Sequence, residues 1–170
     1  MENLERRIDD GEQSSRRQCL RLNNIELPQQ GEKETCMEKV EKVLRDLDCG
    51  VGVESVDRAH RIGPVKVSDE GSRSQQMIVC FNSFRDRTKV YRARKSLSGD
   101  SGVKVRLDLT KKRLDTLIKA QDLVKNHGKC EFAFADINCN LSVKLKGSKG
   151  FIFFTSIADL NDKLDKLDNM

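Results

Sequence analysis

The first half of the chain alternates between strand-like and helix-like patterns of apolar residues. Over residues 18–24, apolar and polar side chains alternate, which is typical of a strand with one buried face. Over residues 37–47 the apolar positions recur at helical spacing, and Gly50 is placed where such a helix would end. The same two patterns predict a helix over 83–97 and strands over 51–62, 77–81 and 103–107.

The order of these elements is strand, helix, strand, strand, helix, strand. This is the split βαβ arrangement of ferredoxin-like domains, and it is also the order found in the RNA-recognition motif. Ser83 followed by Asp86 forms a capping-box pattern, which favours a helix start at this point. We therefore predict an α+β fold in which a ferredoxin-like domain of the RNA-recognition-motif type occupies residues 16–108.

The residues that follow predict a second, smaller α+β domain over 109–170. Thr110 and Ser156 are each placed to cap a helix whose apolar residues recur at helical spacing. Short apolar runs separated by turn-forming residues predict three strands between these helices, over 131–135, 141–145 and 150–154.

Residues 1–15 are polar and predict a short helix or tether. Leu4 and Ile8 are the one apolar pair at helical spacing, so this helix is a candidate for forming a homo-oligomer. No apolar run approaches the roughly 20 residues that span a bilayer, and the amino terminus lacks the apolar centre of a signal peptide. We expect a protein of the cytosol or the nucleus without a membrane partner.

Basic residues are concentrated in the middle of the chain. The sequence has 32 Lys and Arg against 27 Asp and Glu, a net charge of +5. Residues 84–113 alone hold eleven basic and three acidic residues, which leaves the rest of the chain slightly acidic. A block of this kind can attract polyanions, but it can equally be a solvated helix face. Charge alone does not separate these two interpretations.

Catalytic and metal-binding patterns are weak. The chain has no phosphate-binding P-loop, no H-E-x-x-H and no G-x-S-x-G, and Gly99-Asp100-Ser101-Gly102 is better explained as a turn than as a protease nucleophile. The six cysteines include no C-x-x-C pair, and His127, Cys130 and Cys139 lack a fourth ligand. We therefore expect reduced, buried thiols, no metal, no cofactor and no enzymatic activity.

Aromatic residues are missing where an RNA-recognition motif normally carries them. Arg21 stands at an aromatic position of the first strand, and Gln76 and Ile78 occupy the usual stacking positions of the third. A sheet without these rings is expected to bind nucleic acid mainly through its charges. The phenylalanines of the second domain are predicted to form its core rather than to stack on bases, and they are Phe132, Phe134, Phe151, Phe153 and Phe154.

Four stretches of the sequence carry a resemblance to a known family. They are Arg16-Arg17-Gln18-Cys19-Leu20-Arg21-Leu22, Asp57-Arg58-Ala59-His60-Arg61-Ile62-Gly63, Val90-Tyr91-Arg92-Ala93-Arg94-Lys95 and Leu107-Asp108-Leu109-Thr110. Over about residues 15–167 the chain resembles the first-open-reading-frame proteins of LINE-type retrotransposons. These are RNA-binding proteins with a non-canonical RNA-recognition motif and a small carboxy-terminal domain.

The resemblance implies coating and chaperoning of single-stranded RNA within a ribonucleoprotein particle, and trimer formation through a coiled coil. It also implies binding roles for Arg16, Arg17, Arg21, Arg61 and Arg94. With the basic block, the expected nucleic-acid-binding residues are Arg16, Arg17, Arg21, Arg58, Arg61, Arg85, Lys89, Arg92, Arg94, Lys95, Arg106, Lys111 and Lys112. Single-stranded DNA is a second expected ligand. The alternative is a protein-interaction adaptor derived from a retrotransposon protein that has lost RNA binding.

Overall fold

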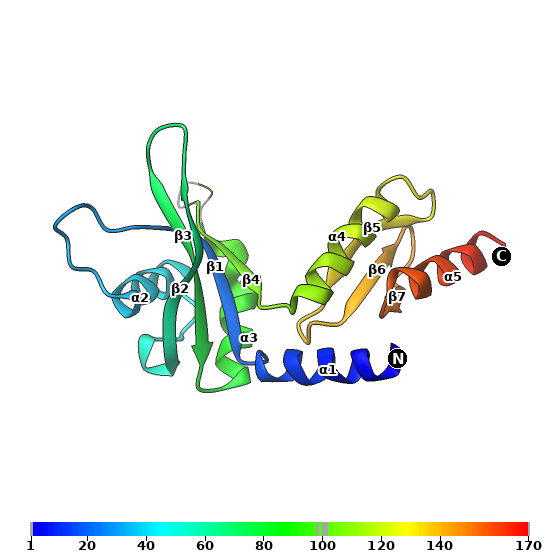
Figure 1. The fold of residues 1–170 in the computed structure, drawn as a ribbon, viewed down its shortest axis with the longest axis horizontal. Coiled ribbons are helices and arrows are strands. Elements are labelled where there is room, and N and C mark those ends of the chain that lie inside the picture. Colours follow the sequence, from blue (N-terminus) through cyan, green and yellow to red (C-terminus); the bar gives the residue numbers. More distant parts are fainter. Residues whose placement is uncertain (1, 98, 100–101, 170) are drawn as a thin grey trace. The chain divides into compact units, whose positions relative to one another are not determined.

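The computed structural model of the chain describes residues 2–97, 99 and 102–169 (Figure 1). Asp100 and Ser101, the central residues of the turn predicted at 99–102, lie outside this part. The chain divides into two compact units. One unit is formed by residues 16–108, and the other combines residues 1–15 with residues 109–170.

The unit of residues 16–108 is a four-stranded antiparallel sheet with two α-helices. The strands lie in the order β2-β3-β1-β4, so that β1 and β3 are central and β2 and β4 are the edges. Its elements are β1 (Cys19–Glu26), α2 (Cys36–Leu47), the 3-10 helix η1 (Val53–Ser55), β2 (Val56–Val67), β3 (Arg73–Phe81), α3 (Phe84–Ala93), the 3-10 helix η2 (Arg94–Ser96) and β4 (Lys104–Leu107). The predicted α+β class is confirmed.

Alternation along the strands gives this sheet two different faces. Leu20, Met77 and Val79 are fully buried, and they lie on the face against which α2 and α3 pack. The helices contribute Val40 and Val90 to the same core. The residues between these positions point to the opposite face, which no helix of this unit covers.

The helix starts follow from capping residues. Ser83 accepts a hydrogen bond from the backbone N–H of Asp86, as its spacing predicts. The sequence analysis did not identify Thr35, which forms a complete capping box with Glu38 before α2. Hydrogen bonds from the backbone N–H and the side chain of Thr35 lower the pKa of Glu38.

The second strand begins and ends five residues later than predicted, and Val53–Ser55 form η1 instead of strand. The sequence suggests that it ends at Gly63 and Pro64, but β2 continues to Val67 and pairs with the start of β3. The pairing register shifts between Ile62 and Lys66, and Gly63 has a φ of 68° within this irregular stretch. Because β2 is an edge strand, Pro64 can lack an N–H without breaking the sheet.

The expectation that all cysteines are reduced is wrong for one pair. Cys19 of β1 and Cys80 of β3 are directly opposite in the register and form a disulfide. The two residues are 61 positions apart in sequence, so only the pairing of the strands brings their side chains together. Of the other cysteines, Cys130 and Cys139 are buried and form no disulfide in the described structure, and burial raises the pKa of Cys130.

The other unit is a three-stranded antiparallel sheet with three helices. The strands lie in the order β5-β6-β7. Its elements are α1 (Glu2–Ser15), α4 (Lys111–Lys125), β5 (Cys130–Ala135), β6 (Leu141–Leu145), β7 (Phe151–Phe154) and α5 (Ile157–Asp168). Thr110 and Ser156 cap α4 and α5 as predicted, each accepting a hydrogen bond from the backbone N–H three residues later.

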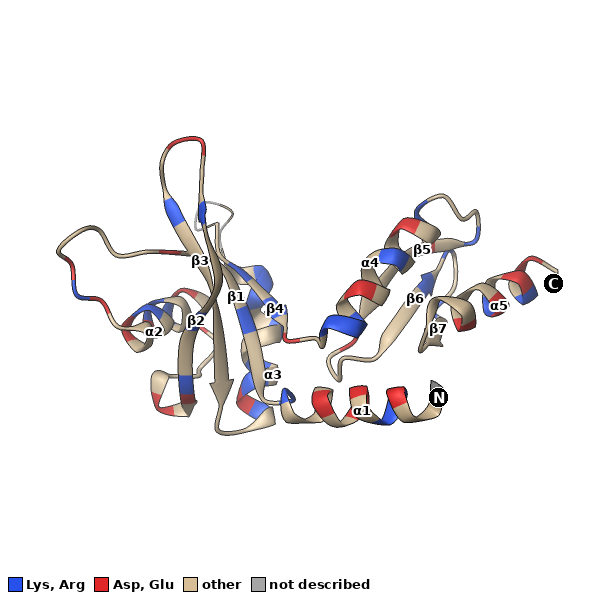
Figure 2. Cartoon of the chain, in the orientation of Figure 1, with Lys and Arg blue, Asp and Glu red and all other residues tan. Residues whose placement is uncertain are grey.

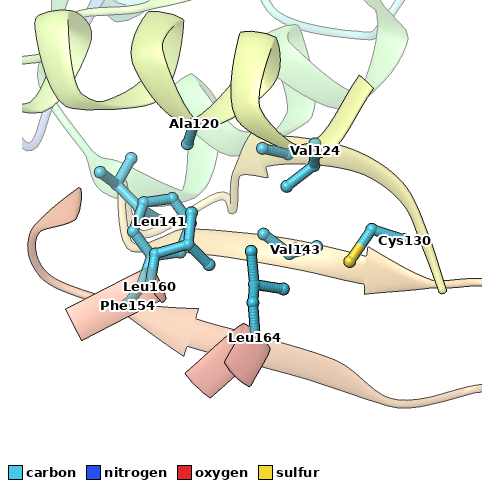
Figure 3. Packing of buried hydrophobic residues seen from close by; sticks show 9 residues of the cluster. Ala120, Val124, Cys130, Leu141, Val143, Phe154, Leu160 and Leu164 are labelled. Atoms are coloured by element: carbon cyan, nitrogen blue, oxygen red, sulfur yellow. The ribbon is translucent and has the colours of Figure 1, made fainter. Parts of the chain in front are cut away.

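Helices α4 and α5 cover one face of this sheet. Figure 3 shows Ala120 and Val124 of α4 and Leu160 of α5 packed around Val143 of the central strand. All four are buried, with an exposed fraction of 1% or less. Phe154 is the one phenylalanine of β5 and β7 that joins this buried cluster.

Helix α1 is attached to α4 by side chains at the start of α4. Thr110 donates its hydroxyl hydrogen to Asp9, and its backbone N–H is bonded to the side chain of Gln13. Arg113 forms ion pairs with Asp9 and Asp10 at 2.8 and 2.6 Å. These bonds hold residues 2–15 against the carboxy-terminal residues of the chain.

Replacing Thr35 by Ala should destabilise the protein by about 1 kcal/mol, because the backbone N–H of Glu38 loses the hydroxyl that accepts its hydrogen bond. The free energy of unfolding in urea measures this. Lys42→Ala, an exposed substitution on the same helix, is the control and should change it by less than about 0.5 kcal/mol. Equal effects of the two substitutions would contradict the role assigned to the cap.

Candidate nucleic-acid interface

The helix-free face of the four-stranded sheet carries cationic side chains on β1, β2 and β4. The strand registers place them on the same face, because Arg21 is opposite both Ile78 and Arg106, and Asn23 is opposite Lys104. On the other edge, Arg58 is opposite Cys80. We call the set Arg21, Arg58, Lys104 and Arg106 the basic sheet face. Figure 2 shows Lys and Arg residues on β1 and β4.

Asp108 fixes the central arginine of this face. Its carboxylate is 3% exposed and accepts hydrogen bonds from Arg16 Nη1 at 3.3 Å and from Arg21 Nε at 2.7 Å. A buried carboxylate requires such partners, because an unpaired charge would be costly to desolvate. The Arg21 side chain keeps 28% of its surface exposed. Among the described residues, the terminal Nη atoms of Arg21 have no hydrogen-bond partner.

The outer members of the basic sheet face are exposed. Lys104 and Arg106 alternate with the buried Val105 on edge strand β4, so both cations lie on the helix-free side. Arg58 lies on the opposite edge strand and forms a solvent-exposed pair with Asp57 at 3.4 Å. Exposed pairs of this kind contribute little free energy, so Arg58 can exchange Asp57 for another anion.

A hollow of about 310 Å³ lies beside edge strand β4 and brings another cation to this edge. Arg94, Lys104 and Arg106 line it, together with Leu97 and Val103. Arg94 follows α3, and its guanidinium lies 4.0 Å from the centre of the Tyr91 ring and donates a hydrogen bond to the Tyr91 carbonyl. The stacking holds this guanidinium in one orientation.

The basic residues of α3 form a separate group. Arg85, Lys89 and Arg92 are exposed at the helical spacing that the sequence predicts, and Lys95 is exposed just after the helix. They belong to a helix that packs on the opposite face of the sheet from Arg21. Arg87 of the same helix is buried between the rings of Phe84 and Tyr91.

Two expected binding residues have contacts within the fold instead. Arg61 alternates to the helix side of β2, opposite Met77, and donates hydrogen bonds to the carbonyls of Ile25 and Glu26. Arg17 is exposed and lies 4.8 Å from the centre of the Phe84 ring. Neither side chain belongs to the basic sheet face.

Lys111 and Lys112 belong to the other unit, where they begin α4. Both are exposed, but acidic residues of α1 lie nearby, and Lys112 pairs with Glu5 at 3.5 Å. Two backbone N–H groups at this helix start are bonded within the unit, because that of Thr110 donates to Gln13 and that of Arg113 donates to the Thr110 hydroxyl. The backbone N–H and the hydroxyl of Thr110 are therefore both bonded to α1.

The sequence analysis missed two components of the interface. Lys104 is one of them, and its alternation with Val105 and Arg106 on a strand could have placed it with Arg106. Asp108 is the other, and no sequence pattern identifies it, because its contacts with Arg16 and Arg21 join positions about ninety residues apart.

Comparisons with known proteins assign no family. No protein-family model matches the chain, and no curated protein matches it. No described helix is long and apolar enough to cross a membrane. Within the described residues, no group of three or more His, Cys, Asp or Glu side chains is arranged to hold a metal ion.

Replacing Asp108 by Asn should lower the free energy of unfolding by about 2 kcal/mol, because Arg16 and Arg21 lose a charged acceptor that is almost fully buried. Urea denaturation measures the loss. Asp57→Asn, which removes the carboxylate of an exposed pair, is the matched control and should cost less than about 0.5 kcal/mol. A stability unchanged in Asp108→Asn would mean that the carboxylate does not hold the two arginines.

Proposed function

We propose that the chain binds single-stranded RNA, and single-stranded DNA by the same chemistry, through the basic sheet face and without sequence preference. The observation that carries the proposal is the alignment of Arg21, Arg58, Lys104 and Arg106 on one helix-free face, with Arg94 at the β4 edge. A group of cations on one face favours the binding of a phosphate backbone. The proposed function is binding without catalysis.

The arrangement of strands and helices supports this proposal. The element order and the strand order β2-β3-β1-β4, with both helices against one face, are the features expected of a ferredoxin-like domain of the RNA-recognition-motif type. In that type of domain, the helix-free face of the sheet contacts the nucleic acid. Arg21, Arg58, Lys104 and Arg106 belong to the corresponding face.

The chemistry of the face favours phosphate contacts over base recognition. Its central positions hold Ile78, Cys80 and Gln76 rather than aromatic rings. Guanidinium groups donate hydrogen bonds in a planar fork that suits phosphate oxygens, and the plane of Arg21 can also stack on a base. Both interactions are available from every nucleotide, so binding tolerates any sequence.

The resemblance to retrotransposon proteins extends the proposal to coating and chaperoning of a transcript in a ribonucleoprotein particle. Leu4 and Ile8 support the proposed homo-oligomer, because both are exposed on α1 at helical spacing. The same two side chains suit the rival function, a protein-interaction adaptor. The adaptor predicts no retention of a single-stranded oligonucleotide at physiological salt.

The affinity for single-stranded RNA should fall steeply with salt. If the four cations of the basic sheet face and Arg94 each contact a phosphate, these five contacts should contribute about −3.5 to the slope of log affinity against log salt. Filter binding of a labelled oligonucleotide at several salt concentrations measures this slope. Binding that is insensitive to salt would overturn the electrostatic mechanism.

Replacing Arg58 and Arg106 together by Ala should weaken binding of every sequence and make the slope shallower by about 1.4, because two phosphate contacts are lost. The matched control removes the same charge from the other side of the sheet, by replacing Arg85 and Arg92 of α3 with Ala. The control should keep the original slope. If the α3 pair has the larger effect, the RNA lies on the helix side of the sheet instead.

A further inference from the structure

The three-stranded sheet also has a face that its helices leave uncovered. Two rows of opposed residues cross it: Phe132, Lys144 and Phe151 form one row, and Phe134, Ser142 and Phe153 form the other. The buried cluster around Val143 lies on the opposite face. We call the set Phe132, Phe134, Phe151 and Phe153 the phenylalanine face.

This placement corrects the expectation that the phenylalanines form the core. Phe154 is buried at 3% exposure, but Phe132, Phe151 and Phe153 are 48%, 51% and 59% exposed. Alternation on β7 explains the division, because Phe154 points to the helices and its neighbour Phe153 to the other side. Exposed rings gathered on one face indicate a binding surface.

The rings are held in place by contacts with one another. The ring of Phe134 lies 5.6 Å from that of Phe132 and 5.5 Å from that of Phe151, between centroids, and the rings are inclined to each other. Both distances are within the range of favourable aromatic pairs. Because neighbouring rings restrict each other, little conformational entropy remains to be lost when a flat ligand binds.

Cations lie among and beside these rings. Lys144 Nζ lies 4.8 Å from the centre of the Phe151 ring. Lys146 and Lys149 are exposed in the turn that joins β6 to β7. Lys144 also donates a hydrogen bond to the carbonyl of Ser148 in this turn. An apolar protein partner would have to bury Lys144, whereas a ligand with both rings and phosphates can use it.

A hollow of about 690 Å³ continues from the edge of the phenylalanine face at Phe153. The cations Arg6, Lys112 and Lys163 line it, and so do the carboxylates of Asp9 and Asp10. Arg113 pairs with both carboxylates, Lys112 pairs with Glu5 and Lys163 pairs with Asp159, so these charges are largely balanced within the chain. Lys112, which the sequence predicts to bind nucleic acid, lines the same hollow as Phe153.

We propose that the phenylalanine face is a second nucleic-acid site, on which bases of a single strand stack while lysines contact the adjoining phosphates. It rests on the proposed function of the chain, since it extends binding from the basic sheet face to the other unit. Base stacking on aromatic side chains is tolerant of sequence, because every base has a π-face. The ligand class is single-stranded nucleic acid with intact bases.

The absence of tryptophan from the sequence allows a direct test. Phe151→Trp places the one indole of the full chain on the phenylalanine face, and Ile118→Trp places it on the exposed surface of α4 as the matched control. The probes are a short single-stranded RNA and an abasic oligonucleotide of the same length. The RNA should quench the emission of Phe151→Trp, while the abasic probe should not, and neither should quench Ile118→Trp.

A second pair of substitutions separates stacking from general apolar contact. The double variant Phe132→Leu, Phe151→Leu keeps an apolar surface but lacks two of the rings. Its affinity for RNA should be about tenfold lower, and the dependence of its affinity on salt should be unchanged. If the unsubstituted chain retains RNA, but RNA leaves the emission of Phe151→Trp unchanged and the Leu variant binds as tightly as the unsubstituted chain, the second site is overturned and the proposed function is not. If the unsubstituted chain does not bind RNA at all, the proposed function is overturned as well. A lower mass in solution for the Leu variant, with unchanged affinity, would identify the face as a contact between copies.

Discussion

The carboxylate of Asp108 is the point at which β4, β1 and the segment before β1 are joined. It lies almost without solvent contact at the end of β4 and accepts hydrogen bonds from Arg16 and Arg21. A carboxylate buried there is stable only with cationic partners, so the positions of the two arginines follow from it. Arg21 is in this way held at the middle of the helix-free face, opposite Ile78 on one side and Arg106 on the other.

The alternation of side chains along the strands places further cations on the same face as Arg21. Val105 points to the helices, so its neighbours Lys104 and Arg106 must point away from them. The same rule applied to β7 buries Phe154 and exposes Phe153. Each sheet thus uses one face for its core and leaves the other to solvent. The two uncovered faces carry different chemistry, charges on one and aromatic rings on the other.

Local patterns in the sequence were sufficient for the helices and for most strands. Helix caps such as Ser83 and Thr110 could be recognised because their hydrogen bonds span three residues. Contacts set by strand pairing could not be, and the disulfide between Cys19 and Cys80 and the bonds of Asp108 are of this kind. The basic block was a correct description of composition, but the fold divides it between the two faces of a sheet and a second unit.

The phenylalanines show why a pattern of alternating rings is ambiguous. Over residues 151–154 the sequence has apolar side chains at every position, so both faces of the strand are apolar and periodicity cannot say which one is buried. The buried face is decided by where α4 and α5 pack. The exposed rings of this sheet are what the central positions of the basic sheet face lack, because those positions hold Gln76, Ile78 and Cys80. The proposed binding mode therefore predicts a preference for single strands, because a duplex keeps its bases stacked inside and cannot offer them to a phenylalanine.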